Sequence, residues 1–255
     1  MDRFLLIVQF MTRIPIKKSF DVTVDDFRMG VRYFPIIGLI VGVITGFFVY
    51  VSSYVFSPFL AGFIGMVSYV ITTGGLHLDG FSDTCDGIFS GREKDKILTI
   101  MSDSRLGTFG GVGLIVLLLG KMTLYTEALL SGSLRYGIGI IIASSIVSRG
   151  VVTFYMYNRK YAKENSGLGD LFIGKITKKE LIINQVIFIC LSLIIWWKFI
   201  FIYPLVAGIM IFIRNKIEKL LGGLTGDILG FSIELSEVIF LVLAIGGVSI
   251  WNLYL

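Results

Sequence analysis

Charged residues are scarce in this chain. Only 16% of its 255 residues are Asp, Glu, Lys or Arg, whereas 55% are hydrophobic. Soluble globular domains carry about a quarter charged residues, and here the apolar residues fall in long blocks, with no charge at all from Tyr33 to Leu76. Runs of roughly 18 or more apolar residues predict membrane-spanning helices. The composition therefore excludes an ordinary soluble domain and predicts an all-α, polytopic membrane protein.

Cysteine and histidine are also scarce. Cys85 and Cys190 are the two cysteines and lie far apart, which excludes a disulfide framework and a CxxC metal pair. His77 is the single histidine, and a lone histidine is more often structural than catalytic. The net charge of +5 comes without a basic helix or aromatic sheet motif, so we expect no nucleic-acid partner.

The apolar blocks predict about seven transmembrane helices in one domain, residues 1–255. The block 181–213 is ambiguous, because it fits either one long tilted helix or two short helices that turn near Trp197. The N-terminal segment has an apolar face with flanking basic residues, which predicts an interfacial helix on the membrane surface. The expected elements are the interfacial segment 1–32 and spans near 33–56, 59–76, 108–130, 135–156, two within 181–213, and 236–254.

The distribution of Lys and Arg favours two helices in the ambiguous block. With seven spans, the basic residues gather on one side, and only Arg135 and Lys198 fall on the other. Basic loops face the cytoplasm. We therefore expect a multi-pass protein of the cell membrane, with the N-terminus and the polar loops cytoplasmic and the C-terminus outside. The expected cytoplasmic segments are 1–32, 77–106, 157–180 and 214–234.

Three aspartates lie in the segment LHLDGFSDTCDG at 76–87. Asp79, Asp83 and Asp86 stand at i, i+4 and i+7, so in a helix they share one face. Carboxylates at this spacing repel each other, and each glycine of the segment disfavours a helix by roughly 1 kcal/mol. A bound cation offsets both effects, and Mg²⁺ prefers carboxylate and phosphate oxygens. We therefore expect a Mg²⁺ site; a solvated acidic loop is the alternative.

A second polar motif, IMSDSRLGTFGG at 100–111, precedes the next apolar block. Asp103 is a candidate fourth ligand of the metal. Arg105 carries a planar, forked donor that suits phosphate oxygens. The glycines that follow open a helix, whose N-terminal amides favour an anion. An ordinary capped helix start, with Ser104 or Thr108 as the cap, explains the motif equally well.

Two further features are candidates for substrate binding. Arg149 lies within a predicted span, where an ionisable residue indicates function, although its side chain also has the length to reach the membrane surface. The segment LGGLTGDILG at 221–230 is a Gly-rich turn that contains Asp227. No Gly-Lys-Ser/Thr follows, so this segment is not a P-loop. A nest for a phosphate or base and a plain turn between helices both remain open.

Taken together, these motifs resemble those of the cobalamin synthase family, the adenosylcobinamide-GDP ribazoletransferases. The resemblance runs in order from near the N-terminus to about residue 237, and the set is far more specific than any one motif. The matching segments are FMTRIP at 10–15, YFPIIG at 33–38, LHLDGFSDTCDG at 76–87, IMSDSRLGTFG at 100–110, SR at 148–149 and GLTGDILG at 223–230.

The resemblance implies the last assembly step of cobalamin biosynthesis. Adenosylcobinamide-GDP would transfer its corrinoid phosphoryl group to a ribose hydroxyl of α-ribazole or α-ribazole 5′-phosphate, with release of GMP and dependence on Mg²⁺. The product would be adenosylcobalamin or its 5′-phosphate. The further partners that it implies are the lipid bilayer, a second copy of the chain and other late enzymes of the cobamide pathway.

The roles that follow on this scheme are hypotheses. The metal ligands would be Asp79, Asp83, Asp86 and Asp103. The catalytic residues would be Asp83, Asp86 as the candidate base, and Arg105. The substrate-binding residues would be Arg13, His77, Arg149, Thr225 and Asp227.

Two other classes of protein remain alternatives. A CDP-alcohol phosphotransferase also sets aspartates at helical spacing for Mg²⁺, but its usual Ala-Arg pair after the first Asp-Gly is absent, because Ser82 and Asp83 stand there instead. A transporter tends to have interrupted helices near the bilayer midplane, whereas the acidic residues here cluster outside the predicted spans.

Overall fold

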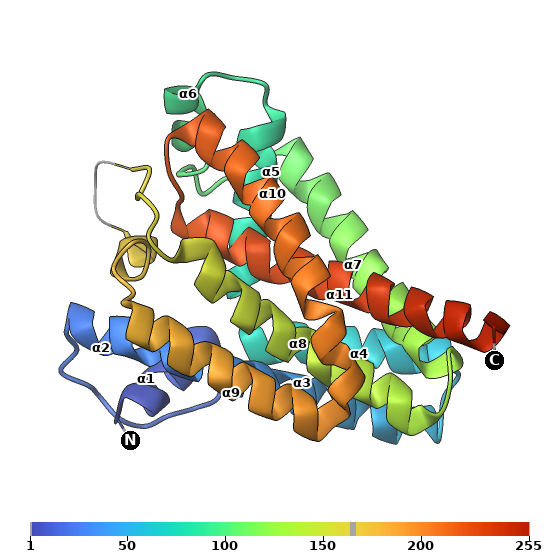
Figure 1. The fold of residues 1–255 in the computed structure, drawn as a ribbon. Coiled ribbons are helices and arrows are strands. Elements are labelled where there is room, and N and C mark those ends of the chain that lie inside the picture. The colour runs from blue at the N-terminus through green and yellow to red at the C-terminus, as the bar shows by residue number, and fades with distance from the viewer. Residues whose placement is uncertain (1, 164–166, 255) are drawn as a thin grey trace.

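The structure is a computed structural model that describes residues 2–163 and 167–254, and its regular elements in these ranges are all helical (Figure 1). The all-α prediction is therefore confirmed. The helices are α1 (Asp2–Met11), α2 (Val24–Gly30), η1 (Val31–Tyr33), α3 (Phe34–Ser53), α4 (Pro58–Thr73), α5 (Leu76–Phe89), α6 (Lys94–Ile100), α7 (Thr108–Leu130), α8 (Leu134–Met156), η2 (Leu168–Leu171), α9 (Lys178–Trp196), η3 (Trp197–Phe201), α10 (Tyr203–Leu221) and α11 (Gly226–Tyr254).

Several long apolar helices mark the chain as a membrane protein. Four stretches of the described residues are long and apolar enough to cross a bilayer, or five if the bent pair α4–α5 counts as one span. The predicted number of about seven is not confirmed: α9 and α10 are not among these stretches, and charged residues gather at the start of α9 and the end of α10. The four stretches are Val24–Ser53, Thr108–Leu130, Leu134–Met156 and Gly226–Gly247.

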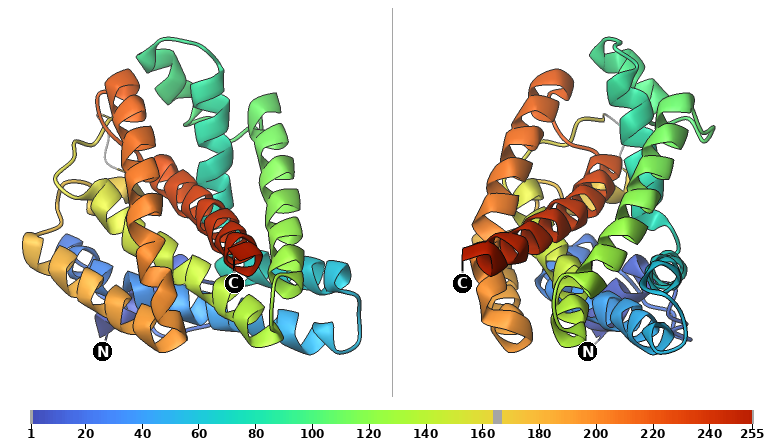
Figure 2. Two further views of the ribbon diagram at one scale, coloured as in Figure 1. Left: turned by 45° about the vertical axis from the view of Figure 1, so that its right-hand side comes forward. Right: turned by 90° about the vertical axis from the view of Figure 1, so that its right-hand side faces the viewer.

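The central helix of the fold is α8, against which α3, α7, α9, α10 and α11 all pack. Small residues let the backbones approach closely, as is common where helices pack in membranes. A Cβ on Gly42 of α3 would lie 2.7 Å from the carbonyl oxygen of Ile142 in α8. The last helix, α11, lies between α10 and α7 in the left view of Figure 2 and packs against both helices. As a result, α11 also packs against α5.

Helix α4 ends at a sharp break before α5. Gly74 and Gly75 have φ values of 65° and 75°, a left-handed conformation that glycine adopts without steric strain. The two helices meet at 94°. The sequence predicts the end of the second span at Leu76 and a polar segment from 77 to 106, and this segment contains α5 and α6. The aspartate segment is thus helical, as the one-face argument requires.

Of two expectations for the second half of the chain, the structure confirms one and differs from the other. The block 181–213 divides into two helices, with a break at Trp197–Phe201, so the two-helix prediction is confirmed. The polar segment expected at 214–234 is mostly helical, because α10 continues to Leu221 and α11 begins at Gly226.

At the N-terminus, α1 buries Leu6, Ile7, Val8 and Met11 within the protein, so these side chains pack on protein and not on lipid.

A network of buried charges joins four of the long helices. Lys121 of α7 pairs with Glu234 and Glu237 of α11, and its ammonium nitrogen lies 2.7 Å from a carboxylate oxygen of Glu237. Arg149 of α8 pairs with the same Glu237. Tyr69 of α4 donates a hydrogen bond to Glu234 at 2.7 Å. All five side chains are fully buried, so each charge depends on its partners for stabilisation.

Candidate active site

The aspartate helix α5 lies against the first turn of α11. Gly80 faces the backbone of Asp227, where an added Cβ would lie 2.7 Å from the Asp227 carbonyl oxygen. Gly230 packs in the same way on His77, with the corresponding distance 3.1 Å. Only glycine permits this approach, because any side chain would separate the two helices. The contact brings Asp227 of α11 close to Asp79 and Asp83 of α5, although nearly 150 residues separate them in the sequence.

A third segment closes the site from the loop between α8 and α9. The amide of Ala162 donates to the Leu224 carbonyl at 2.8 Å, and the amide of Leu224 donates to the Lys160 carbonyl at 2.9 Å. This short pairing places Lys163 beside α11, with its ammonium nitrogen 3.3 Å from a carboxylate oxygen of Asp227. Sequence reasoning used Lys163 only as a charge in a cytoplasmic loop and did not identify it as a site residue.

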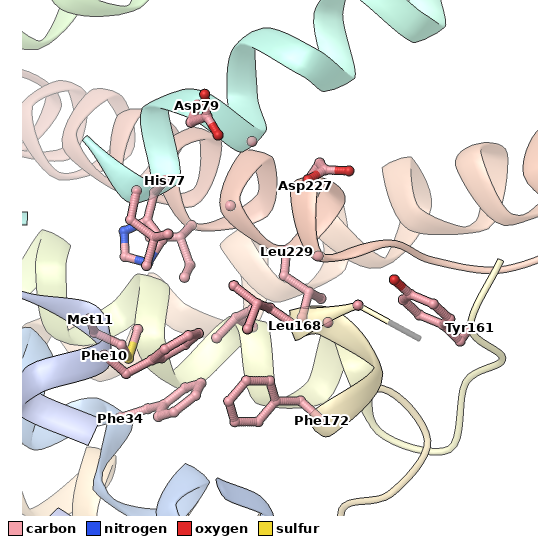
Figure 3. Close-up of a pocket in the computed structure, with 18 of the residues that line it drawn as sticks. Phe10, Met11, Phe34, His77, Asp79, Tyr161, Leu168, Phe172, Asp227 and Leu229 are labelled. Atoms are coloured by element: carbon pink, nitrogen blue, oxygen red, sulfur yellow. The ribbon is translucent and has the colours of Figure 1, made fainter. Parts of the chain in front are cut away.

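These segments surround a cavity of about 260 Å³ (Figure 3). Asp79 and Asp227 lie on one side of it, and Phe10, Phe34 and Phe172 lie on the opposite side. The cavity is therefore acidic at its rim and aromatic at its floor. The remaining described lining residues are Met11, Leu76, His77, Gly80, Val152, Tyr161, Lys163, Gly167, Leu168, Gly169, Gly226, Leu229, Gly230 and Ile233.

The rim carries excess negative charge. Asp83 lies in α5, which is outside the four long apolar stretches. Burial, together with the nearby charges of Asp79, Asp227 and Asp86, raises the pKa of Asp83 to about 7, while the charge of Lys163 opposes this shift. A raised carboxyl pKa in such a cluster means that ionising all the acids together is unfavourable. A bound cation would relieve this repulsion.

Asp86 has a specific partner at the start of the next span. Its two carboxylate oxygens accept hydrogen bonds from the amides of Gly107 and Gly110, each at 2.8 Å. These amides belong to the first turn of α7, whose N–H groups lack partners within the helix. A carboxylate there also interacts favourably with the helix dipole. The glycines make room for Asp86, because a Cβ on either would collide with its carboxylate.

Asp103 and Arg105 pair with each other in the loop before α7. The guanidinium of Arg105 lies 2.6 Å from a carboxylate oxygen of Asp103, and the Arg105 side chain is 87% exposed. Hydrogen bonds from Arg105 lower the pKa of Asp103 to about 2. Neither residue lines the cavity. Their predicted roles as metal ligand and phosphate clamp remain predictions.

The other sequence-predicted residues lie in three different settings. Arg13 is exposed and packs on Gly74 at the break between α4 and α5. Thr225 is buried at the start of α11, where its hydroxyl donates to Asp227 at 3.2 Å and accepts from the Ile228 amide at 3.3 Å. Arg149 sits in the buried charge network with Glu237 and does not line the cavity. The sequence analysis does not identify Glu237 as the partner of Arg149, although two buried cations in apolar helices require nearby acids.

The site residues fit a magnesium ion with part of its shell supplied by a substrate. Among the described residues, no group of three or more His, Cys, Asp or Glu side chains is placed to hold a metal by itself. Mg²⁺ is usually bound by one or two carboxylates together with substrate phosphates. Asp79 and Asp83 lie one helical turn apart on α5 and have oxygen donors of the right kind. The donor set therefore suits Mg²⁺ with a phosphate ligand.

These observations define a helical membrane protein with an acid-rimmed cavity between α5, α11 and the loop after α8. A family model described as Cobalamin-5-phosphate synthase matches residues 3–245. The chain belongs to this family, and it is a transferase of cobalamin biosynthesis. The family match favours this class over the CDP-alcohol phosphotransferase and transporter alternatives.

Relatives from several bacteria are similar over nearly their whole length. A protein of Clostridioides difficile (strain 630) named adenosylcobinamide-GDP ribazoletransferase is 38% identical, over 95% of this chain and 96% of its own. Proteins of the same name from Klebsiella pneumoniae (strain 342) and Escherichia coli (strain K12) are 35% and 37% identical, each over 94% of this chain and 97% of their own. No solved structure matches the chain.

Proposed function

We propose that this transferase moves the corrinoid phosphoryl group of adenosylcobinamide-GDP to a ribose hydroxyl of α-ribazole or α-ribazole 5′-phosphate, and that the reaction depends on Mg²⁺. The observation that supports this most is the meeting of α5 and α11 at the cavity rim, where Asp79 and Asp227 line the cavity and Asp83 lies close to both. Phosphoryl transfer requires charge neutralisation and positioning above all, and an acidic rim that attracts a cation meets the first requirement.

Asp79 and Asp83 are the proposed ligands of Mg²⁺. When bound, the ion would neutralise charge on the diphosphate and on the leaving GMP. Asp86 is less suited to this task than the sequence suggests, because both of its oxygens already accept hydrogen bonds from α7. We assign it to holding the start of α7 in place.

Asp227 is the proposed base. The attacking hydroxyl oxygen forms a bond to the phosphorus that carries the corrinoid, and the bond from that phosphorus to the bridging oxygen of the diphosphate breaks. The hydroxyl proton passes to Asp227, and GMP leaves. Lys163, 3.3 Å from Asp227, is placed to contact a phosphate oxygen and so to stabilise the developing charge.

The site is proposed to face the cytoplasm of a cell-membrane protein. Basic residues accumulate in the loops around it, in 157–180 and at the end of α10, which is the pattern that cytoplasmic loops show. The nucleotide-activated substrate is a cytoplasmic type of compound, which agrees with this orientation.

The test is a turnover assay with the purified protein in detergent or nanodiscs. Adenosylcobinamide-GDP, α-ribazole and Mg²⁺ are supplied, and GMP and the joined corrinoid are quantified. A CDP-alcohol donor serves as the matched control for donor class. We expect GMP release that requires both substrates, and no reaction with the CDP-alcohol. Absence of GMP release from folded protein would refute the proposal.

A further inference from the structure

The cavity has two chemically different halves, of which the proposed reaction so far uses only the rim. The floor is formed by three aromatic rings from distant parts of the chain: Phe10 of α1, Phe34 of α3 and Phe172 after η2. Phe172 lies 5.6 Å from Phe10 and 5.7 Å from Phe34 between ring centroids. Figure 3 shows these rings grouped on the side of the cavity away from Asp79 and Asp227.

Further apolar side chains line the cavity. Val152 of α8 and Ile233 of α11 are almost wholly buried, and Met11 and Leu229 line the cavity as well. Aromatic and aliphatic walls of this kind bind planar rings by stacking and by removal of apolar surface from water. Such a floor is unsuited to a phosphate or a sugar, since both would lose hydrogen bonds to water there.

One buried polar group of the cavity lining lacks a hydrogen-bond partner in the part of the chain that the structure describes. His77 lines the cavity and is 5% exposed, and its Nδ1 has no hydrogen-bond partner among the described residues. Buried polar groups are nearly always hydrogen-bonded, so an unpaired ring nitrogen beside a cavity indicates a ligand with one complementary polar atom.

We infer that the aromatic floor binds the base of the acceptor nucleoside, with His77 hydrogen-bonded to the free nitrogen of that base. The inference rests on the proposed function and names the acceptor subsite. The benzimidazole of α-ribazole is a flat, fused ring with an apolar edge and a single unsubstituted nitrogen, which accepts one hydrogen bond. The ribose of α-ribazole would then extend toward the rim, where Asp227, the proposed base, would accept the hydroxyl proton.

Size and polarity decide against two other ring systems of the donor, the corrin and the guanine. At about 260 Å³, the cavity is slightly smaller than the pockets of about 300–1,000 Å³ that hold drug-sized ligands, so a corrin macrocycle does not fit. The guanine of the donor would fit by size. Guanine, however, carries several donors and acceptors along its edge, and an apolar floor with one imidazole would leave most of them unpaired, which is unfavourable.

The experiment measures binding separately from turnover. Binding of α-ribazole and of 5,6-dimethylbenzimidazole to the purified full chain is measured by calorimetry without Mg²⁺ and without donor. Ribose 5-phosphate and GMP serve as comparison ligands. We expect both benzimidazole compounds to bind and both comparison ligands to fail to displace them. If dimethylbenzimidazole does not bind, or GMP displaces it, the assignment of the floor is wrong, whatever the turnover assay shows.

Matched variants locate the binding. Phe172→Leu shortens a floor residue with little change in volume, and His77→Phe removes the hydrogen bond. Each should raise the KM for α-ribazole about tenfold or more while leaving the KM for adenosylcobinamide-GDP unchanged. The control is Phe27→Leu, because Phe27 packs edge-on against Phe172 with centroids 5.8 Å apart but does not line the cavity.

The outcomes separate this inference from the proposed function. An equal rise in acceptor KM for Phe27→Leu and Phe172→Leu would show that cluster packing, and not ligand contact, is responsible. A rise in donor KM alone would place the donor on the floor. Either result overturns the subsite while wild-type GMP release still supports the reaction. A GMP-release failure with intact dimethylbenzimidazole binding would instead overturn the reaction.

Discussion

Gly80 of α5 packs directly on the backbone of Asp227 in α11, with room for a hydrogen and not for a methyl group. This contact sets the distance between the two acidic segments of the rim. Gly80→Ala should therefore push α5 and α11 apart and lower turnover at least about tenfold, with an overpacking penalty of about 1–3 kcal/mol in stability. Turnover is measured at saturating Mg²⁺ and substrates, together with thermal unfolding of the purified variant.

The control for this substitution is Gly120→Ala in the middle of α7, where an added Cβ meets nothing within 4 Å. That variant should keep wild-type turnover. If Gly80→Ala is fully active, close packing of α5 on α11 is not required for the site.

Arg149 and Glu237 form a second informative pair, buried between α8 and α11. Arg149→Met should destabilise the protein by about 3–5 kcal/mol, because it leaves Glu237, which is fully buried, with one cation fewer. Adding Glu237→Gln should recover much of this loss, because the double variant retains the pair Lys121–Glu234. Thermal unfolding in detergent measures both.

This comparison also tests the sequence-based hypothesis that Arg149 clamps a phosphate. A clamp would leave the single variant as stable as the wild type but with a raised KM for the donor. Wild-type stability of Arg149→Met would therefore contradict the structural role that the buried network implies.

Asp86 is expected to stabilise the start of α7 and not to bind the cation. Asp86→Asn replaces one accepting oxygen by an NH₂ group that faces an amide donor, so the variant should lose about 1–2 kcal/mol of stability, as other helix-cap losses do. The Mg²⁺ concentration for half-maximal turnover should stay the same. A large rise in that concentration, with unchanged stability, would show that Asp86 is a metal ligand, as the helical spacing of the aspartates predicts.

Asp103 provides the matching test in the loop before α7. Its exposed pair with Arg105 is screened by solvent and contributes little to stability, so Asp103→Asn should leave stability and the Mg²⁺ requirement nearly unchanged. A strongly increased Mg²⁺ requirement would show that Asp103 is a ligand of the metal. The same titration serves Asp86 and Asp103, which makes the two results directly comparable.

The sequence predicts the helical class and most helix positions because long apolar runs and helix breakers are local signals. It also identifies the α5 aspartates, because their spacing is a property of one helix. It does not predict that Asp227 meets them, since this depends on the contact between Gly80 and the α11 backbone. The ion partners of Lys121 and Arg149 were missed for the same reason: Glu234 and Glu237 lie about 90 or more residues away in the sequence.

The number of membrane spans is a second feature that local sequence patterns do not determine. Apolar blocks and charge bias predict about seven, whereas the described residues contain four or five long apolar stretches. The helices α9 and α10 are not among them, and both carry charged residues near one end. Their relation to the bilayer depends on packing around α8, which no local pattern encodes.

The most direct test of the account is the cation dependence of GMP release by the wild type, Asp79→Asn and Asp83→Asn. The account predicts no release after chelation, recovery with added Mg²⁺, an Mg²⁺ requirement raised about tenfold or more in Asp79→Asn, and loss of turnover in folded Asp83→Asn. Undiminished release by the chelated wild type, or wild-type behaviour of both variants, would contradict it.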